Sequence, residues 1–150
     1  MEINGVAHTF ITAGDFEKSV AFYRQLLPFL GMRVVGESPD TFYCVGGRTG
    51  FGIRRPDPQH EGARFEQYRV GLHHHCWRAR ERADVDTAHA FLVAIGATIV
   101  HEPQDDAYAP GYYSVLFEDS DGIRLEINHV PGRGLFDTPT QRVGASLDGR

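Results

Sequence analysis

Residues 6–31 read VAHTFITAGDFEKSVAFYRQLLPFLG, a short alternating segment followed by a longer one with helical periodicity. The alternation over residues 6–12 predicts a strand, and Asp15 is a typical residue to begin a helix. Gly31 follows the last apolar residue of the periodic run and predicts the end of the helix. The apolar residues at helical spacing are Phe16, Val20, Tyr23, Leu27 and Leu30.

Three short segments after this helix are rich in β-branched and aromatic residues. They lie near residues 32–36, 41–45 and 50–54, and Pro-Asp and Gly-Gly pairs separate them. Such segments between turn signals are typical of strands. The first half of the chain therefore predicts the order βαβββ.

The same order recurs in the second half, after a polar, proline-containing stretch. A strand is expected over about residues 70–79, followed by a helix that Asp84 begins and Gly96 ends. The apolar positions of this helix are Val85, Ala88, Leu92 and Ile95. Three more strands are expected near residues 98–101, 112–118 and 123–129.

This repeat predicts an α+β chain of two βαβββ modules. We place the first module at residues 1–58, a linker at 59–69 and the second module at 70–130. Residues 131–150 contain proline, glycine and polar residues and are predicted to be a partly ordered C-terminal tail.

Composition narrows the classes of function. A formal net charge of −5 with a single lysine, Lys18, argues against nucleic acid as a partner, because nucleic-acid binding depends on clustered Lys and Arg. No apolar run approaches the roughly 20 residues that cross a bilayer, and the first residues do not look like a signal peptide. We therefore expect a cytoplasmic protein with no membrane partner, two reduced cysteines and a small-molecule substrate.

Three consecutive histidines occur in the stretch GLHHHCWRA at residues 71–79. His74 precedes its helix-ending glycine by nearly the same number of residues as His8 precedes Gly31, so the repeat makes His74 the counterpart of His8. Strand alternation places His74 on one face and Trp77 on the other, where Trp77 is expected to pack under the helix. A slip of one residue would bring His75 to the position of His74.

Three segments together are similar to the vicinal oxygen chelate superfamily, which includes glyoxalase I, extradiol dioxygenases, and fosfomycin and bleomycin resistance proteins. They are HTFITAGD at 8–15 leading to AFY at 21–23, His74 with the helix that contains residues 84–86, and FEDSDGIRLE at 117–126. The resemblance implies curved mixed sheets around a metal-binding concave cleft. It also implies His8, His74 and Glu126 as ligands of one divalent ion (Fe, Mn, Ni, Zn or Co), an ion that polarises vicinal oxygens of a substrate.

Three positions depart from individual members of that superfamily. Gly52 stands opposite Glu126 when the two modules are overlaid, so the fourth protein ligand of glyoxalase I is absent. Leu116 replaces the active-site tyrosine of extradiol dioxygenases, and Phe10 replaces a threonine of fosfomycin resistance proteins. We therefore expect a metal-dependent, glyoxalase-like lyase or isomerase, with an extradiol-type dioxygenase or a metal-free binding protein of the bleomycin-resistance kind as alternatives.

Strand alternation and the family pattern together predict which residues line the pocket. Tyr112, Ser114 and Leu116 are expected on the face of Glu126, and Gly52 and Arg54 on the inward face of the first module. Arg54 and Tyr112 are the predicted substrate-binding residues, Arg54 by pairing with an anionic group, although an arginine at a strand end is also commonly a solvated one. The sequence does not identify a catalytic base.

The resemblance also implies a homodimer, because two small modules leave sheet edges and apolar faces that superfamily members usually cover by pairing. The expected light-scattering mass is twice that of the chain. A monomer mass that does not change with concentration contradicts this expectation.

Overall fold

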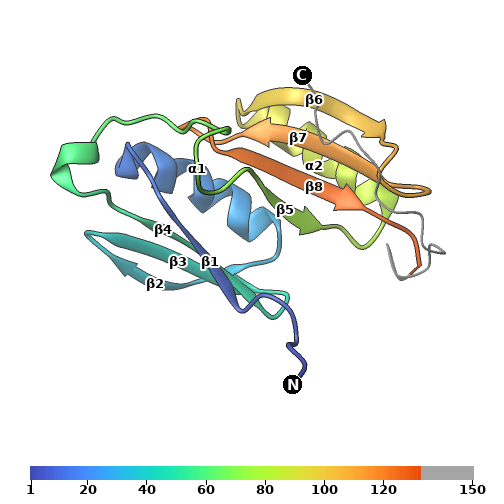
Figure 1. Cartoon of the computed structure of the whole chain (residues 1–150), viewed down its shortest axis with the longest axis horizontal. Helices are drawn as coiled ribbons and strands as arrows, with labels where there is room; N and C mark the ends of the chain where they lie inside the picture. The colour runs from blue at the N-terminus through green and yellow to red at the C-terminus, as the bar shows by residue number, and fades with distance from the viewer. Residues whose placement is uncertain (133–150) are drawn as a thin grey trace. The chain divides into compact units, whose positions relative to one another are not determined.

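The computed structural model describes residues 1–132, so most of the predicted tail, residues 133–150, lies outside the described residues. The chain divides into two compact units, which are described separately. Unit 1 comprises residues 1–73 together with Glu118–Ile123, and the described part of unit 2 comprises residues 74–117 and 124–132 (Figure 1).

Unit 1 contains a four-stranded mixed sheet in the order β1-β4-β3-β2. β1 runs parallel to β4, whereas β4, β3 and β2 are antiparallel neighbours. The elements in chain order are β1 (His8–Thr12), α1 (Phe16–Phe29), β2 (Arg33–Ser38), β3 (Thr41–Gly46), β4 (Thr49–Arg54) and a 3-10 turn, η1 (Pro58–His60).

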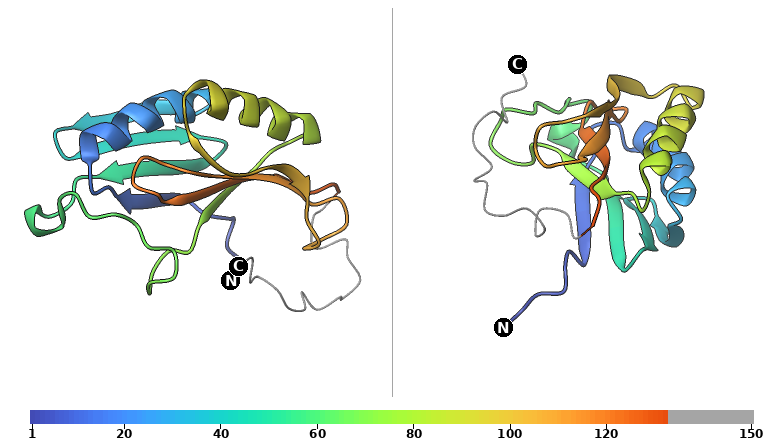
Figure 2. Two further views of the ribbon diagram at one scale, coloured as in Figure 1. Left: turned by 90° about the horizontal axis from the view of Figure 1, so that it is seen from above. Right: turned by 90° about the vertical axis from the view of Figure 1, so that its right-hand side faces the viewer.

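The first helix begins and ends as the sequence predicts. The side chain of Asp15 accepts a hydrogen bond from the Lys18 backbone N–H, and Gly31 adopts a φ of +78° just after the helix. α1 lies along one face of the sheet (Figure 2). The apolar side of α1 packs there because the burial of each large apolar side chain stabilises the fold by about 1.5–3 kcal/mol. The most buried side chains on the two sides of this core are Tyr23, Leu26, Leu27, Phe42, Phe51 and Ile53.

Unit 2 repeats this topology with a sheet in the order β5-β8-β7-β6, in which β5 is parallel to β8. Its helix contacts β8 and β6 and lies across one face of the sheet (Figure 2). The elements are β5 (His75–Arg78), α2 (Arg82–Ala94), β6 (Thr98–Asp105), β7 (Tyr113–Glu118) and β8 (Arg124–His129). The predicted α+β fold with two βαβββ repeats is confirmed.

The prediction that Asp84 begins the second helix is wrong. Glu81 is the N-cap, and the Asp84 carboxylate accepts a hydrogen bond of 2.9 Å from the Glu81 backbone N–H. The two side chains form a reciprocal capping box, in which the residue in the third helical position caps the chain before the helix. Asp84 is therefore the third residue of α2, and it caps the helix from that position.

Two strands also differ in length from the prediction. β5 begins only at His75, because its parallel ladder with β8 covers His75–Arg78 and no residue before them. β6 extends to Asp105, well past the predicted end near residue 101. Neither of the described helices, of 14 and 13 residues, is long and apolar enough to span a membrane.

The turn between β7 and β8 belongs to unit 1 and packs against the start of α1. The buried carboxylate of Asp121 accepts hydrogen bonds from the Gly14 backbone N–H at 2.6 Å and from the Ser19 hydroxyl at 3.3 Å. The hydroxyl of buried Tyr23 donates to Asp119 at 2.7 Å, and burial raises the pKa of both Tyr23 and Asp119. The Asp-x-Asp-Gly sequence therefore fixes this turn onto the first helix.

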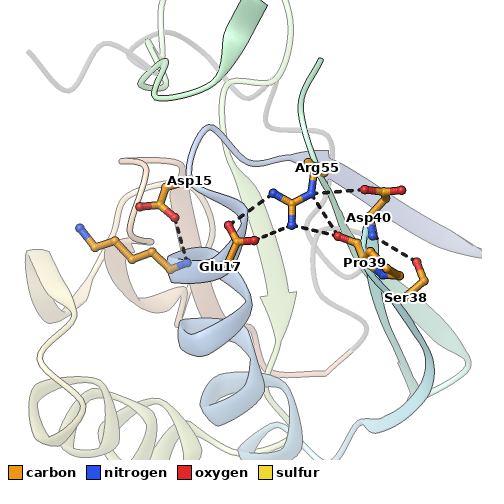
Figure 3. Close-up of polar contacts among 7 residues, drawn as sticks. Asp15, Glu17, Ser38, Pro39, Asp40 and Arg55 are labelled. Atoms are coloured by element: carbon orange, nitrogen blue, oxygen red, sulfur yellow. Dashed lines mark hydrogen bonds and ion pairs between the residues drawn. The ribbon is translucent and has the colours of Figure 1, made fainter. Parts of the chain in front are cut away.

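A second polar cluster joins the start of α1 to the end of β4 and to the turn between β2 and β3 (Figure 3). The Arg55 guanidinium pairs with Glu17 of α1 and with Asp40 in the turn between β2 and β3, and it donates to the Pro39 carbonyl at 3.0 Å. The guanidinium also stacks over the Phe16 ring at 4.5 Å. Arg55 is therefore a structural residue of unit 1.

Candidate functional site

The face of the unit 1 sheet opposite α1 carries His8 and Phe10. His8 pairs in register with Gly50 of β4, and Phe10 pairs with Gly52. Both side chains are exposed, whereas the next residue, Ile11, lies on the helix side and is buried. His8 therefore lies on the open face, as the sequence predicts.

The strand register identifies the counterpart of His8 in unit 2. Cys76 pairs with Glu126 just as Phe10 pairs with Gly52, and the residue two positions earlier is His74 in unit 2 and His8 in unit 1. Counting back from Cys76, His74, which directly precedes β5, corresponds to His8, and alternation places His75 on the other face. The shared register also makes Gly52 the equivalent of Glu126, as the overlay of the two sequences predicts.

Glu126 is the buried carboxylate of this face in unit 2, with only 7% of its surface exposed. One of its oxygens lies 3.5 Å from Nε2 of His74, and the other accepts a hydrogen bond of 2.6 Å from the Tyr112 hydroxyl. Burial, and then the hydrogen bond to Glu126, raise the pKa of Tyr112, so this phenol stays protonated near neutral pH. Tyr112 therefore acts as a fixed donor to Glu126.

Cys76 lies beside Glu126 on the neighbouring strand. Burial raises the pKa of its thiol strongly, and the negative charge of Glu126 raises it further. The side chain therefore stays a neutral thiol, which is a weak nucleophile and a weak metal ligand.

The remaining predicted wall residues lie on β7 or directly before it, next to the strand of Glu126, and on β4. Tyr113 donates to Asp86 of α2 at 2.6 Å, which assigns it to the helix side and places Tyr112, Ser114 and Leu116 on the side of Glu126 by alternation. The Ser114 hydroxyl donates to Asp106 at 3.0 Å and is buried. Sequence reasoning did not identify Asp106, because the irregular turn that carries it has no periodicity.

Arg54 lies at the end of β4 on the same face as Gly50 and Gly52. Its side chain is exposed, and over residues 1–132 it takes part in no hydrogen bond or ion pair. The neighbouring Arg55 has three polar partners and a ring contact, so the fold of unit 1 uses the side chain of Arg55 and leaves that of Arg54 available.

The other histidines near Glu126 face away from it. His75 contacts the Trp77 ring edge to face at 4.5 Å, and burial lowers the pKa of His75. His129 follows Glu126 by an odd number of residues and lies on the opposite face of β8. Its Nδ1 atom is buried and has no hydrogen-bond partner among the described residues.

The predicted metal ligands are divided between the units. His8 belongs to unit 1, and His74 and Glu126 belong to unit 2. Neither unit, over residues 1–132, gathers by itself three His, Cys, Asp or Glu side chains that can hold a metal ion. In unit 2, a facing imidazole and carboxylate supply two donors of a chemistry that suits a divalent ion.

The family is decided by a match over most of the chain. Residues 5–127 match the model of the glyoxalase/bleomycin resistance protein/dioxygenase superfamily. The chain belongs to this superfamily. It is the vicinal oxygen chelate superfamily, so the family resemblance drawn from the sequence is confirmed. The superfamily includes many enzymes, among them glyoxalases and dioxygenases. No curated protein matches the chain.

Solved structures of this superfamily share the fold. A candidate glyoxalase from Bacillus halodurans is 27% identical, with a TM-score of 0.75, over 84% of this chain and 96% of that one. A glyoxylase/bleomycin resistance protein/dioxygenase domain from Frankia sp. is 24% identical, with a TM-score of 0.68, over 85% and 98%. Lactoylglutathione lyase from Agrobacterium tumefaciens is 23% identical, with a TM-score of 0.63, over 86% and 96%.

Proposed function

We propose that the chain is a metal-dependent enzyme of the vicinal oxygen chelate superfamily that acts on a small oxygenated substrate through two adjacent oxygens. His8, His74 and Glu126 are the proposed ligands of one divalent ion. The single observation that carries the proposal is the register shared by the two units, which gives His8 and His74 equivalent positions and sets Glu126 beside His74.

The donor set suits this assignment. Two imidazoles and one carboxylate leave open positions on a divalent ion, and a bound ion polarises oxygens and stabilises negative charge that develops on them. Tyr112 orients Glu126 through its 2.6 Å hydrogen bond. No residue is proposed as the catalytic base.

An extradiol-type dioxygenase is the second candidate, favoured by one observation in unit 1. A Cβ atom added at Gly52 would lie 2.1 Å from Cε1 of Phe10, so the Phe10 ring fills the place of a fourth ligand. Two histidines and one carboxylate form the facial triad typical of Fe(II) oxygenases. A four-ligand glyoxalase site is disfavoured for the same reason.

Turnover assays with and without a chelator test the proposal. Protein purified without chelator is supplied with the hemithioacetal of methylglyoxal and a thiol, or with 3,4-dihydroxybenzoate in an oxygen electrode. We expect turnover of one substrate class, loss of turnover after chelation and recovery with one added metal. A protein that binds such compounds equally well before and after chelation, without turnover, is instead a metal-free binding protein.

Replacing Tyr112 with phenylalanine is expected to weaken metal affinity by about 10-fold, because outer-shell partners typically contribute 10–100-fold. The variant removes the donor to Glu126 and keeps the ring. Tyr108, whose ring contacts that of Tyr112, provides the matched control Tyr108→Phe. Metal titration followed by calorimetry measures both variants, and equal affinities for the two would show that the Tyr112 hydroxyl does not position Glu126.

A further inference from the structure

The open face of the unit 1 sheet carries two aromatic rings that lie over glycines. Phe10 of β1 and Tyr43 of β3 both pair in register with Gly52 of β4, one from each side. Their rings are nearly parallel, at 13°, with centroids 5.2 Å apart. The face therefore has a stacked aromatic pair above a strand that has no side chain at that point.

The two glycines of β4 are required for this arrangement. A Cβ atom at Gly52 would lie 2.1 Å from the Phe10 ring, and one at Gly50 would lie 2.1 Å from the Tyr43 hydroxyl. Phe10 is nevertheless 41% exposed, although an aromatic ring gains free energy from burial. β4 therefore has no side chain beneath the Phe10 ring, which lies against the strand backbone and is exposed on its outer side.

The fixed charge that the three strands β1, β3 and β4 carry on this face lies at one end of it. Among the residues of β1, β3 and β4 on this side, Arg54 carries the only fixed charge, and it pairs in register with Thr12 and Thr41, which are neutral. His8 lies at the opposite end, in edge contact with Phe10 at 5.6 Å between ring centroids. Neighbouring rows along β4 are two residues apart, which is roughly 7 Å. His8, Phe10 and Arg54 therefore form a line along the sheet.

We propose that this face binds a planar, conjugated small molecule that carries a carboxylate, with its ring on Phe10 and its carboxylate on Arg54. Aromatic rings prefer such stacked or edge contacts, and a guanidinium binds a carboxylate through two parallel hydrogen bonds. The orientation of the bound molecule rests on the proposed function. If His8 is a metal ligand, the vicinal oxygens lie near His8, at the end of the molecule away from its carboxylate. The substrate class is then an aromatic acid with adjacent oxygens.

Ligand binding to chelator-treated protein separates this inference from the proposed function. Two-dimensional NMR of the full chain is recorded with benzoate and with 3,4-dihydroxybenzoate, with cyclohexanecarboxylate as the saturated probe. We expect shifts of the signals of β1 and β4, including Phe10 and Arg54, with the two aromatic acids and about 10-fold weaker binding of cyclohexanecarboxylate. Neither metal nor turnover enters this measurement.

Variants identify the two contacts separately. Phe10→Leu is expected to weaken benzoate binding about 10-fold, and Gly52→Ala to weaken it in the same direction because the added methyl group displaces the ring. Phe29→Leu, at a phenylalanine of similar exposure at the end of α1, is the matched control. Arg54→Ala is expected to weaken binding of benzoate about 10-fold and to leave binding of catechol, which has no carboxylate, unchanged. Lys18→Ala on α1 controls for the loss of charge.

The outcomes distinguish the two proposals. Benzoate binding that is the same in the native protein, Phe10→Leu and Arg54→Ala overturns the inference, as does the absence of any shift on β1 and β4. Circular dichroism melts exclude unfolding of the variants as the cause of lost binding. If the expected benzoate pattern is found in a protein that never binds metal, the inference holds and the proposed function fails.

Discussion

Replacing Asp121 with alanine is expected to lower the free energy of unfolding by about 3 kcal/mol, the largest effect on stability that we predict for a single side chain. The carboxylate is buried and accepts hydrogen bonds from the Gly14 and Asp15 backbone N–H groups and from the Ser19 hydroxyl. Alanine removes all three acceptor contacts and leaves the Gly14 N–H buried without a partner. Such an orphaned donor costs about 1–3 kcal/mol, and hydrogen bonds to a charged group are stronger than neutral ones.

Thermal unfolding followed by circular dichroism measures this effect, and the expected fall in melting temperature is roughly 6–12 °C for a chain of this size. Asp57→Ala is the matched control, because Asp57 is exposed and its side chain makes no capping hydrogen bond. The melting temperature of Asp121→Asn is expected to lie between those of Asp121→Ala and Asp57→Ala, since the asparagine amide oxygen can still accept a hydrogen bond from the Gly14 N–H. A melting temperature of Asp121→Ala equal to that of Asp57→Ala would show that the turn does not hold unit 1.

Loss of any one proposed ligand is expected to lower metal affinity by at least about 100-fold, the upper end of what an outer-shell partner contributes. The variants are His8→Ala, His74→Ala and Glu126→Gln. Glutamine is chosen for Glu126 because its amide oxygen still accepts from Tyr112, so that the buried phenol keeps a partner. His8 and His74 are exposed, and their truncation is expected to leave the melting temperature nearly unchanged.

His75→Ala is the matched control for His74→Ala, because the two histidines are adjacent in sequence, but His74 lies beside Glu126 and His75 contacts the Trp77 ring. Metal affinity is measured by competition with a chromogenic chelator. We expect the affinity of His75→Ala to match that of the native protein. Loss of affinity in His75→Ala with retention in His74→Ala contradicts the register that relates the two units.

Periodicity and the repeat were sufficient to predict the fold. Gly31 and Gly96 both adopt positive φ at the ends of their helices, and a glycine in that position is readily recognised in a sequence. The start of the second helix was misplaced because Glu81 and Asp84 are both acidic and cap each other. Local sequence does not show which of two such residues lies outside the helix.

Contacts between residues distant in sequence could not be predicted in this way. Asp121 and Gly14 are 107 positions apart, so the sequence motif predicted a turn before a strand and gave no indication of its partner on the first helix. Alternation predicted that Tyr112 lies on the same face of the sheet as Glu126, but it could not predict the hydrogen bond between the two side chains. The Phe10 ring over Gly52 was also missed, because a glycine in a strand indicates a close approach without identifying the group that approaches.

Metal analysis of the native protein, purified without chelator, tests the central claim most directly. Inductively coupled plasma mass spectrometry of the purified chain, alongside Glu126→Gln prepared in the same way, gives the metal content per chain. The account predicts about one divalent ion per chain in the native protein and almost none in the variant, as expected for a site that loses its one charged ligand. A native protein that carries no divalent ion and does not take one up on titration contradicts the account.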